Sequence, residues 1–272
     1  MDKTEFEEYL VNVGLKNNTI KNHIRNIDKF EKLNFYDLQI SQDNVIKSLK
    51  DDEISNSQRL TLSSTMSKYL QFSLLPNKKL VEYIKTINNE LTKQYAKRNK
   101  EKEFNYTKKD LLREINNFYK NKNYRAYIVS YLVYYYNIRN MDVNVNICRK
   151  KKYALCEHDN YLILRKNSVL YYRNNYKTSR TYGSKTHVVK ARKFLESVRY
   201  MLRDPDINCI RLFDGFSNST TILKSYLPFG LRTGEIIKII LAEDNSLHKA
   251  CKIGLRRGTS LATLEKSYNL IV

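Results

Sequence analysis

Four side chains in this sequence could together carry out phosphate chemistry. They are Arg139, Lys177, Arg232 and Tyr268. Guanidinium groups stay protonated and bind phosphate oxygens through pairs of parallel hydrogen bonds. A phenol becomes a nucleophile once it is positioned and deprotonated, and a lysine can give a proton to a leaving oxygen. These residue types therefore predict the attack of a tyrosine on a phosphodiester.

Each of the four residues lies at a predicted boundary of local structure. Arg139 follows an apolar and aromatic stretch that predicts a buried helix, and Lys177 lies near the tip of a predicted hairpin. Arg232 stands at a helix start in P-F-G-L-R-T-G-E. We expect Gly258 and Thr259 to form a turn between two helices, and Tyr268 comes nine residues after Thr259. The chain has 22 tyrosines, so Tyr268 gains meaning only from its place in this set.

The order and spacing of these residues resemble the tyrosine recombinases of the phage-integrase family, over essentially the whole chain. The first motif of that family has an acid three residues after its arginine, as Asp142 follows Arg139. The hairpin lysine of the family matches Lys177, with Lys185 as a rival on the same hairpin. A leucine precedes the second arginine of the family, as Leu231 precedes Arg232 here.

Two positions depart from the family pattern. The second motif is His-x-x-Arg in the family, and Phe229 stands here at the histidine position. The third motif is glycine followed by histidine or tryptophan, and here Thr259 follows Gly258. A threonine can still donate one hydrogen bond to a phosphate oxygen, whereas a phenylalanine cannot. Arg256 and Arg257, next to this turn, could substitute electrostatically.

The resemblance implies a site-specific DNA recombinase or integrase. Tyr268 would become joined to a 3′-phosphate, Arg139 and Arg232 would bind the charged phosphate, and Lys177 would protonate the leaving 5′-oxygen. The phosphotyrosyl bond would keep the energy of the phosphodiester, so the expected reaction needs no metal, ATP or other small-molecule cofactor. The expected partners are double-stranded DNA and further copies of the chain, in a homo-tetramer on paired sites.

The charge of the chain independently predicts a polyanionic partner. Lys and Arg total 49 against 28 Asp and Glu, which gives a net charge of +21 and a pI near 9.6. Basic proteins gain affinity for nucleic acids by releasing counterions from phosphates. The four cysteines follow no zinc motif and are expected to be reduced thiols. No signal peptide or membrane-length apolar run is recognised, so we expect an intracellular protein, in cytosol, host nucleus or virion.

The first region of the chain predicts a compact helical domain. Within the segment 20–30, apolar side chains recur at helical spacing, and Lys21, Arg25 and Lys29 fall on the other face. We expect these three cations to be solvated or to contact DNA. The following run of polar and charged residues, which includes Arg98 as a predicted DNA contact, predicts either a basic linker along phosphates or a solvated extension of the preceding helix.

The second region predicts helices with one small sheet. The segments 161–164 and 168–173 are rich in β-formers, and 181–189 is expected to continue the hairpin. Arg173, at the end of one of these strands, is a predicted DNA contact. The predicted fold is α+β overall: an all-α, SAM-like core-binding domain, then a mostly helical catalytic domain with a small antiparallel sheet. The predicted boundaries are 1–95 for the first domain, 96–104 for the linker and 105–272 for the catalytic domain.

Two other interpretations stay open at this point. Type IB topoisomerases share the arginines, lysine and tyrosine, but they carry a β-containing N-terminal part that the helical first region does not resemble. A catalytically weak DNA-binding relative, similar to the baculovirus very-late-factor proteins, would process or package viral genomes. The absent histidines favour this second interpretation, and a coding bias rich in Lys, Asn, Tyr and Ile fits a large DNA virus.

Overall fold

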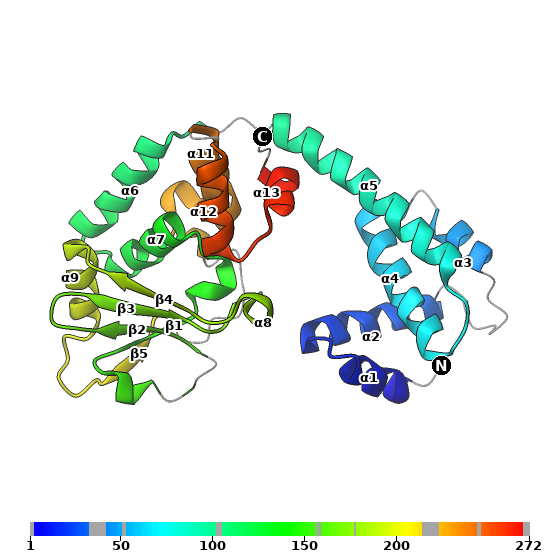
Figure 1. Cartoon of the computed structure of the whole chain (residues 1–272), viewed down its shortest axis with the longest axis horizontal. Helices are drawn as coiled ribbons and strands as arrows, with labels where there is room; N and C mark the ends of the chain where they lie inside the picture. Colours follow the sequence, from blue (N-terminus) through cyan, green and yellow to red (C-terminus); the bar gives the residue numbers. More distant parts are fainter. Residues whose placement is uncertain are drawn as a thin grey trace. The chain divides into compact units, whose positions relative to one another are not determined.

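The structure is a computed structural model, in which the chain divides into two compact units, Met1–Arg98 and Asn99–Val272. The residues that it describes are 3–32, 42–50, 53–101, 105–154, 156, 159–176, 178–213, 223–243 and 246–268. The fold class is α+β, as predicted, with helices in both units and a small sheet in the second (Figure 1).

Helices build the described part of the first unit. They are α1 (Lys3–Asn12), α2 (Asn17–Lys32), α3 (Gln42–Leu49), α4 (Asn56–Phe72) and α5 (Lys78–Glu101). Their apolar faces meet in one hydrophobic core. In α2, Ile27 and Phe30 are buried, whereas Lys21, Arg25 and Lys29 lie on its more accessible side. The predicted separation of this helix into an apolar and a cationic face is therefore confirmed, and DNA contact by the cations stays a prediction.

Helix α5 runs through part of the predicted linker. Residues 96–101 are helical, which corresponds to the alternative of a helix that continues into solvent. The remaining linker positions, 102–104, lie outside the described residues, as does the side chain of Arg98.

The second unit begins with two helices and continues into the sheet. Its helices are α6 (Lys108–Lys120), α7 (Tyr124–Tyr136), α8 (Ser179–Tyr182), α9 (Arg192–Met201), α11 (Thr233–Glu243), α12 (Leu247–Arg257) and α13 (Leu261–Tyr268). Its short 3-10 turns are η1 (Asn140–Val143), η2 (Lys151–Tyr153) and η3 (Pro228–Gly230). The predicted buried helix corresponds to α7, and the predicted pair around the Gly-Thr turn to α12 and α13.

The sheet is mixed, which corrects the prediction of an antiparallel one. Its strands are β1 (Val145–Cys148), β2 (Asn160–Leu164), β3 (Val169–Arg173), β4 (Lys185–Val189) and β5 (Cys209–Arg211), in the order β4-β3-β2-β1-β5. β1 and β2 pair in parallel, because the chain passes through η2 between them instead of reversing in a tight turn. The hairpin prediction is also corrected at Thr181 and Tyr182, which belong to α8.

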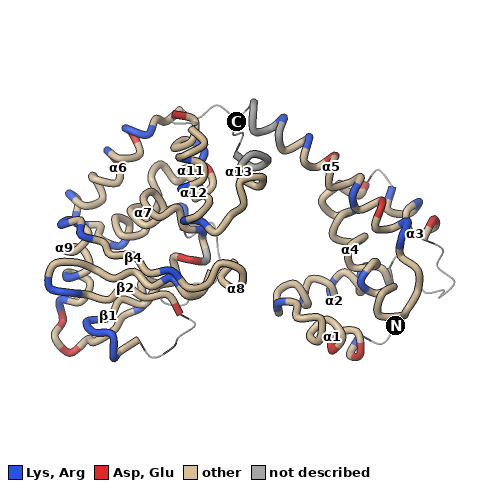
Figure 2. The backbone as a smooth tube through the Cα atoms, in the orientation of Figure 1, with Lys and Arg blue, Asp and Glu red and all other residues tan. Residues whose placement is uncertain are grey.

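One hydrophobic core joins the sheet to the helices of the second unit. α7 has buried residues on all sides and packs against α9, which in turn packs against β2 and β3. Because α7 is fixed in this core, the residues that follow it have a rigid support. Lysine and arginine are spread over the elements of both units (Figure 2). None of the described helices has the length and apolar character needed to cross a membrane.

The cysteines only partly follow the expectation of reduced thiols. Cys148 and Cys209 form a disulfide, which contradicts that expectation, whereas Cys156 and Cys251 are free and exposed. The two bonded cysteines lie directly opposite each other where β1 and β5 pair. Sequence could not have indicated this pairing, because it depends on strands whose cysteines are 61 residues apart along the chain.

Candidate functional site

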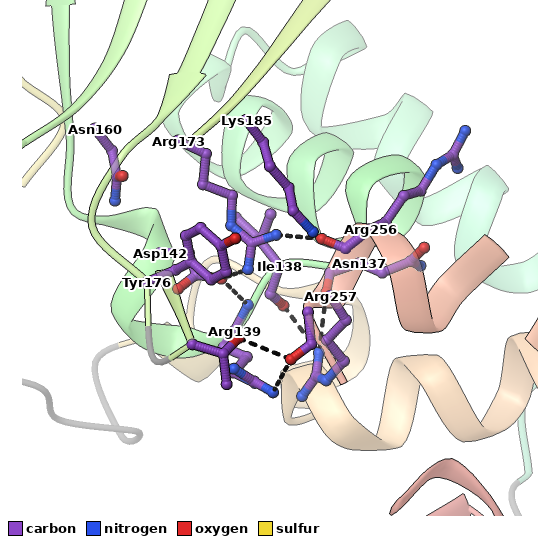
Figure 3. Close-up of polar contacts among 12 residues, drawn as sticks. Asn137, Ile138, Arg139, Asp142, Asn160, Arg173, Tyr176, Lys185, Arg256 and Arg257 are labelled. Carbon is purple, nitrogen blue, oxygen red and sulfur yellow. Dashed lines mark hydrogen bonds and ion pairs between the residues drawn. The ribbon is translucent and has the colours of Figure 1, made fainter. Parts of the chain in front are cut away.

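Arg139 is the centre of the candidate site. It follows the end of α7, where Asn137 takes a left-handed conformation with φ 54° and so turns the chain out of the helix. The Nη2 of Arg139 donates to Thr259 Oγ1 at 2.7 Å and to the Gly258 carbonyl at 3.3 Å. Figure 3 shows Arg139 beside Arg257, at the end of α12. The first predicted arginine is thus in direct contact with the turn that precedes α13, 120 residues later in the chain.

A buried ion pair between Asp142 and Arg173 holds the backbone of Arg139. The backbone N–H of Arg139 donates to Asp142 Oδ2 at 2.9 Å, and the same oxygen accepts from Arg173 Nη2. The side chains of Asp142 and Arg173 are 0% and 1% exposed. The prediction that Arg173 contacts DNA is therefore wrong, because its guanidinium is enclosed by protein. Its ring contact with Tyr176, 4.3 Å from the guanidinium carbon to the ring centroid, completes this enclosure.

The C-terminal end of α12 gathers several donors. Arg173 donates to the Arg256 carbonyl, and Lys185 to the Leu255 carbonyl. Thr178 donates to the Gly258 carbonyl at 2.7 Å. The last carbonyls of a helix lack partners within it and carry the negative end of its dipole, which accounts for the cations collected there.

Gly258 is required where this helix ends. Its φ of 64° lies in the left-handed region, and a Cβ built on it would lie 2.5 Å from Thr178 Oγ1 and 2.9 Å from a ring carbon of Tyr176. A side chain would therefore be strained and would also displace the segment between β3 and α8 from the turn.

Arg257 does not lie at the surface, where it could replace an absent histidine beside a phosphate. It is buried, with 7% of its surface exposed, and its Nη1 donates to the carbonyls of Asn137 at 3.1 Å and Ile138 at 3.3 Å. Arg256 likewise donates to the Tyr135 carbonyl at 2.6 Å. Both arginines thus tie the end of α12 to the end of α7, and Arg257 positions Arg139 through the backbone just before it.

Lys185 and His187 lie on β4 beside this cluster. Burial, followed by the charges of Arg173 and Arg139, lowers the pKa of Lys185 from its ordinary value. Burial, with Arg173, Arg256 and Lys185 nearby, lowers the pKa of His187 to about 4. His187 is therefore neutral at pH 7, and Lys185 has a surrounding that favours release of its proton. The sequence indicates Lys185 only as a rival of Lys177, and it gives no sign that His187 lies nearby.

Arg232 is brought to the same region through its backbone neighbours. It precedes α11 and is exposed, and its N–H donates to Glu235 Oε2 at 2.8 Å. The next residue, Thr233, donates to Asn140 Oδ1 at 2.8 Å. Because Asn140 follows Arg139 directly, this hydrogen bond joins the neighbours of the two predicted phosphate-binding arginines. The backbone segments that carry the two arginines are thus joined, and the binding of one phosphate by both side chains stays a prediction.

The turn before Arg232 is strained at Phe229. Phe229 has φ 54° and ψ 23°, Gly230 has φ 63°, and the Leu231 N–H donates to the Pro228 carbonyl at 3.0 Å. These values describe a type I′ turn, whose first central position favours Asn, Asp or Gly. A bulky residue with positive φ costs on the order of 1–2 kcal/mol. The Phe229 ring lies parallel to that of Tyr106, with centroids 4.0 Å apart.

Two predicted catalytic side chains lie outside the part of the chain that the structure describes. Lys177 lies outside the described residues, between β3 and α8. Tyr268 is the last residue of α13, and its side chain lies outside the described part. Their roles stay predictions.

Comparison with known proteins leaves the family open. No family model matches the chain, and no curated protein matches it. Among solved structures, the crystal structure of XerA recombinase is similar at 13% identity, covering 98% of this chain and 92% of that one, with a TM-score of 0.36. A likeness of this size carries no argument about activity.

Proposed function

We propose that this chain cuts and rejoins double-stranded DNA through a 3′-phosphotyrosyl intermediate, as a site-specific recombinase does. The observation that carries this proposal is the hydrogen bond from Arg139 to Thr259. It joins the predicted first arginine to the turn ahead of α13, the helix that ends at the predicted nucleophile Tyr268. The order of the residues along the chain does not by itself require Arg139 and Thr259 to be in contact.

The cations of the site suit a phosphodiester. Arg139 and Arg232 would bind its non-bridging oxygens, whose charge grows in the pentavalent transition state. The buried Asp142 is already engaged by Arg173 and by the Arg139 backbone, so it does not compete as a free anion. Thr259 accepts a hydrogen bond from Arg139, and its hydroxyl proton remains available for a phosphate oxygen.

The reaction would proceed by in-line displacement. The Tyr268 phenolate would bond to phosphorus while the bond from phosphorus to the 5′-oxygen breaks, and the leaving oxygen would take a proton from a lysine. Lys177 is the predicted donor. Lys185 is its rival, because its lowered pKa favours proton release and its ammonium lies beside the α12 carbonyls. The reverse reaction would religate DNA without a cofactor.

A second candidate is a DNA-binding relative with little or no cleavage activity, acting in viral genome processing or packaging. The observation that favours it is the engagement of Phe229, which replaces a family histidine, with Tyr106 instead of with a polar group. Assembly as a homo-tetramer on paired sites and action inside cells are further parts of the recombinase proposal. The type IB topoisomerase alternative would relax supercoils without exchanging strands.

A suicide-substrate assay tests the proposal. Nicked duplexes from the genome that encodes the chain would trap a covalent protein–DNA adduct after cleavage. We expect an adduct with the wild type and none with Tyr268→Phe. Tyr95→Phe, at a half-exposed tyrosine of α5, is the matched control and should leave the adduct unchanged. Absence of the adduct in the wild type, with salt-sensitive DNA binding retained, would support the second candidate.

A further inference from the structure

The turn that leads into Arg232 has an unusual occupant. Phe229 takes up the first central position of a type I′ turn, where its side chain is disfavoured, and Gly230 follows at the second. A bulky residue persists in a strained conformation only when its surroundings determine that conformation more strongly than the local preference does. The contacts of Phe229 therefore reveal what holds the turn in this form.

Phe229 stacks on the ring of Tyr106. The two rings are 3° from parallel with centroids 4.0 Å apart, and η3 packs against α6 around them. Phe229 remains 37% exposed, so burial in a core does not fix it. The parallel ring of Tyr106 is thus the element that selects the orientation of Phe229.

Tyr106 is itself rigidly attached to the second unit. It directly precedes Thr107, which caps α6: the Thr107 N–H donates to Asp110 Oδ2 at 2.9 Å, and the Asp110 N–H donates to Thr107 Oγ1 at 3.2 Å. The next N–H, of Lys108, donates to Glu243 Oε1 at 2.6 Å. The start of α6 is therefore bound to the end of α11, while Tyr106 stacks on the turn before the start of α11.

From this arrangement we propose that Tyr106 and Phe229 are positioning residues for Arg232. Leu231 leaves the turn in an extended conformation, and Arg232 follows with its N–H bound by Glu235. The stack fixes the turn on one side of Arg232, and the Thr233–Asn140 hydrogen bond fixes the helix on the other. Arg232 would thereby be directed toward the phosphate that Arg139 would also bind. The inference rests on the proposed function for the phosphate, and on geometry alone for the positioning.

The stack also gives Phe229 a role that the family histidine position does not predict. A histidine there would act on the phosphate itself, whereas Phe229 would act through the conformation of the chain. Its rigidity would replace part of what a direct hydrogen bond supplies, because misplacement of a charged group by about 1 Å can cost roughly a hundredfold in rate.

The test removes the stack and follows three quantities. Tyr106→Leu keeps an apolar side chain without the ring face, Tyr106→Phe keeps the ring, and both are also made in an Arg232→Ala background. Tyr200→Leu is the matched control, since Tyr200 is a half-exposed tyrosine whose ring contacts Tyr124 instead. The measurements are amide hydrogen exchange at Leu231, DNA affinity, and the rate of covalent adduct formation at saturating nicked DNA.

We expect Tyr106→Leu to speed exchange of the Leu231 amide and to slow adduct formation roughly tenfold or more. It should slow nothing further in the Arg232→Ala background, because it acts through that arginine. Tyr106→Phe should behave like the wild type, and Tyr200→Leu should leave all three quantities unchanged. If Tyr106→Leu does not fold, Phe229→Gly removes the ring while accepting the positive φ.

Two results would overturn the inference: unchanged Leu231 exchange in Tyr106→Leu, or an equal rate loss with and without Arg232. If the wild type forms no adduct, the proposed function fails, and DNA affinity then decides the positioning. In that case, Tyr106→Leu and Arg232→Ala should weaken binding by similar factors that do not multiply when combined. Independent factors would again overturn it.

Discussion

The two arginines that we propose for phosphate binding are held in opposite ways. Arg139 is half-buried, and hydrogen bonds fix its guanidinium to Thr259 and Gly258. Its backbone N–H is held by Asp142, which forms a buried ion pair with Arg173. Arg232 is exposed, and a strained turn with a capping contact fixes its backbone. One residue depends on electrostatics in the interior, and the other on the conformation of the chain.

This difference predicts how each region responds to substitution. A buried network couples the site to folding, because removal of one partner leaves a charge without its counter-ion in a dry interior. A surface turn can be altered with little loss of global stability, since its groups remain solvated. Variants around Arg139 should therefore change the free energy of unfolding, whereas variants around Arg232 should change DNA binding and rate.

The strongest test of this contrast is Asp142→Ala. It would leave the Arg173 guanidinium buried without its carboxylate and the Arg139 N–H without its acceptor. We expect the free energy of unfolding, measured in urea, to fall by about 3–5 kcal/mol. The matched control is Asp43→Ala, which breaks the exposed pair with Lys79 and should cost less than about 1 kcal/mol. Equal losses in the two variants would contradict a special role for the buried network.

A smaller loss is expected for Gly258→Ala. The new Cβ would adopt a positive φ and would clash with Thr178 and Tyr176, so we expect a loss of about 2–3 kcal/mol. Gly14→Ala is the control, because Gly14, just after α1, also has a positive φ, at 76°, but a Cβ there would meet open space. It should lose only the conformational part, about 1 kcal/mol. Thermal unfolding of both variants separates the clash from the backbone strain.

The elements of this fold followed from local patterns in the sequence. The amphipathic spacing in α2, the apolar run of α7 and the Gly-Thr turn between α12 and α13 each predicted a helix or a boundary that the structure contains. These features depend on neighbours a few residues apart, which a sequence displays directly. Strands β2 and β3 were predicted on the same basis.

The missed features depend on residues that meet only in three dimensions. Arg173 looked like any strand-end cation, and its burial against Asp142 became apparent only when β3 and η1 came together. The stack of Tyr106 on Phe229 joins residues 123 positions apart in the sequence.

The pH dependence of unfolding gives a third test of the Arg139 region. His187 contacts the rings of Tyr136 and Tyr171, and burial and the nearby cations lower its pKa to about 4, from 6.5. As pH falls below 6.5, the unfolded chain binds a proton at this position before the folded one does. Stability should therefore decline between pH 6.5 and about 4. His187→Phe should decline less over this range, and parallel curves would refute the assignment.

The smallest effect on folding, and the clearest one on binding, is expected for Arg232→Ala. Because Arg232 is exposed, its loss should change the free energy of unfolding by no more than about 0.5 kcal/mol. Arg139→Ala removes the hydrogen bonds to Thr259 and Gly258 and should cost about 1–2 kcal/mol. If both arginines bind phosphate, each variant should reduce by about one the slope of log affinity against log salt. A salt slope that changes only with Arg139→Ala would leave Arg232 outside the phosphate site, and the two regions would then differ in function as well as in how they are held.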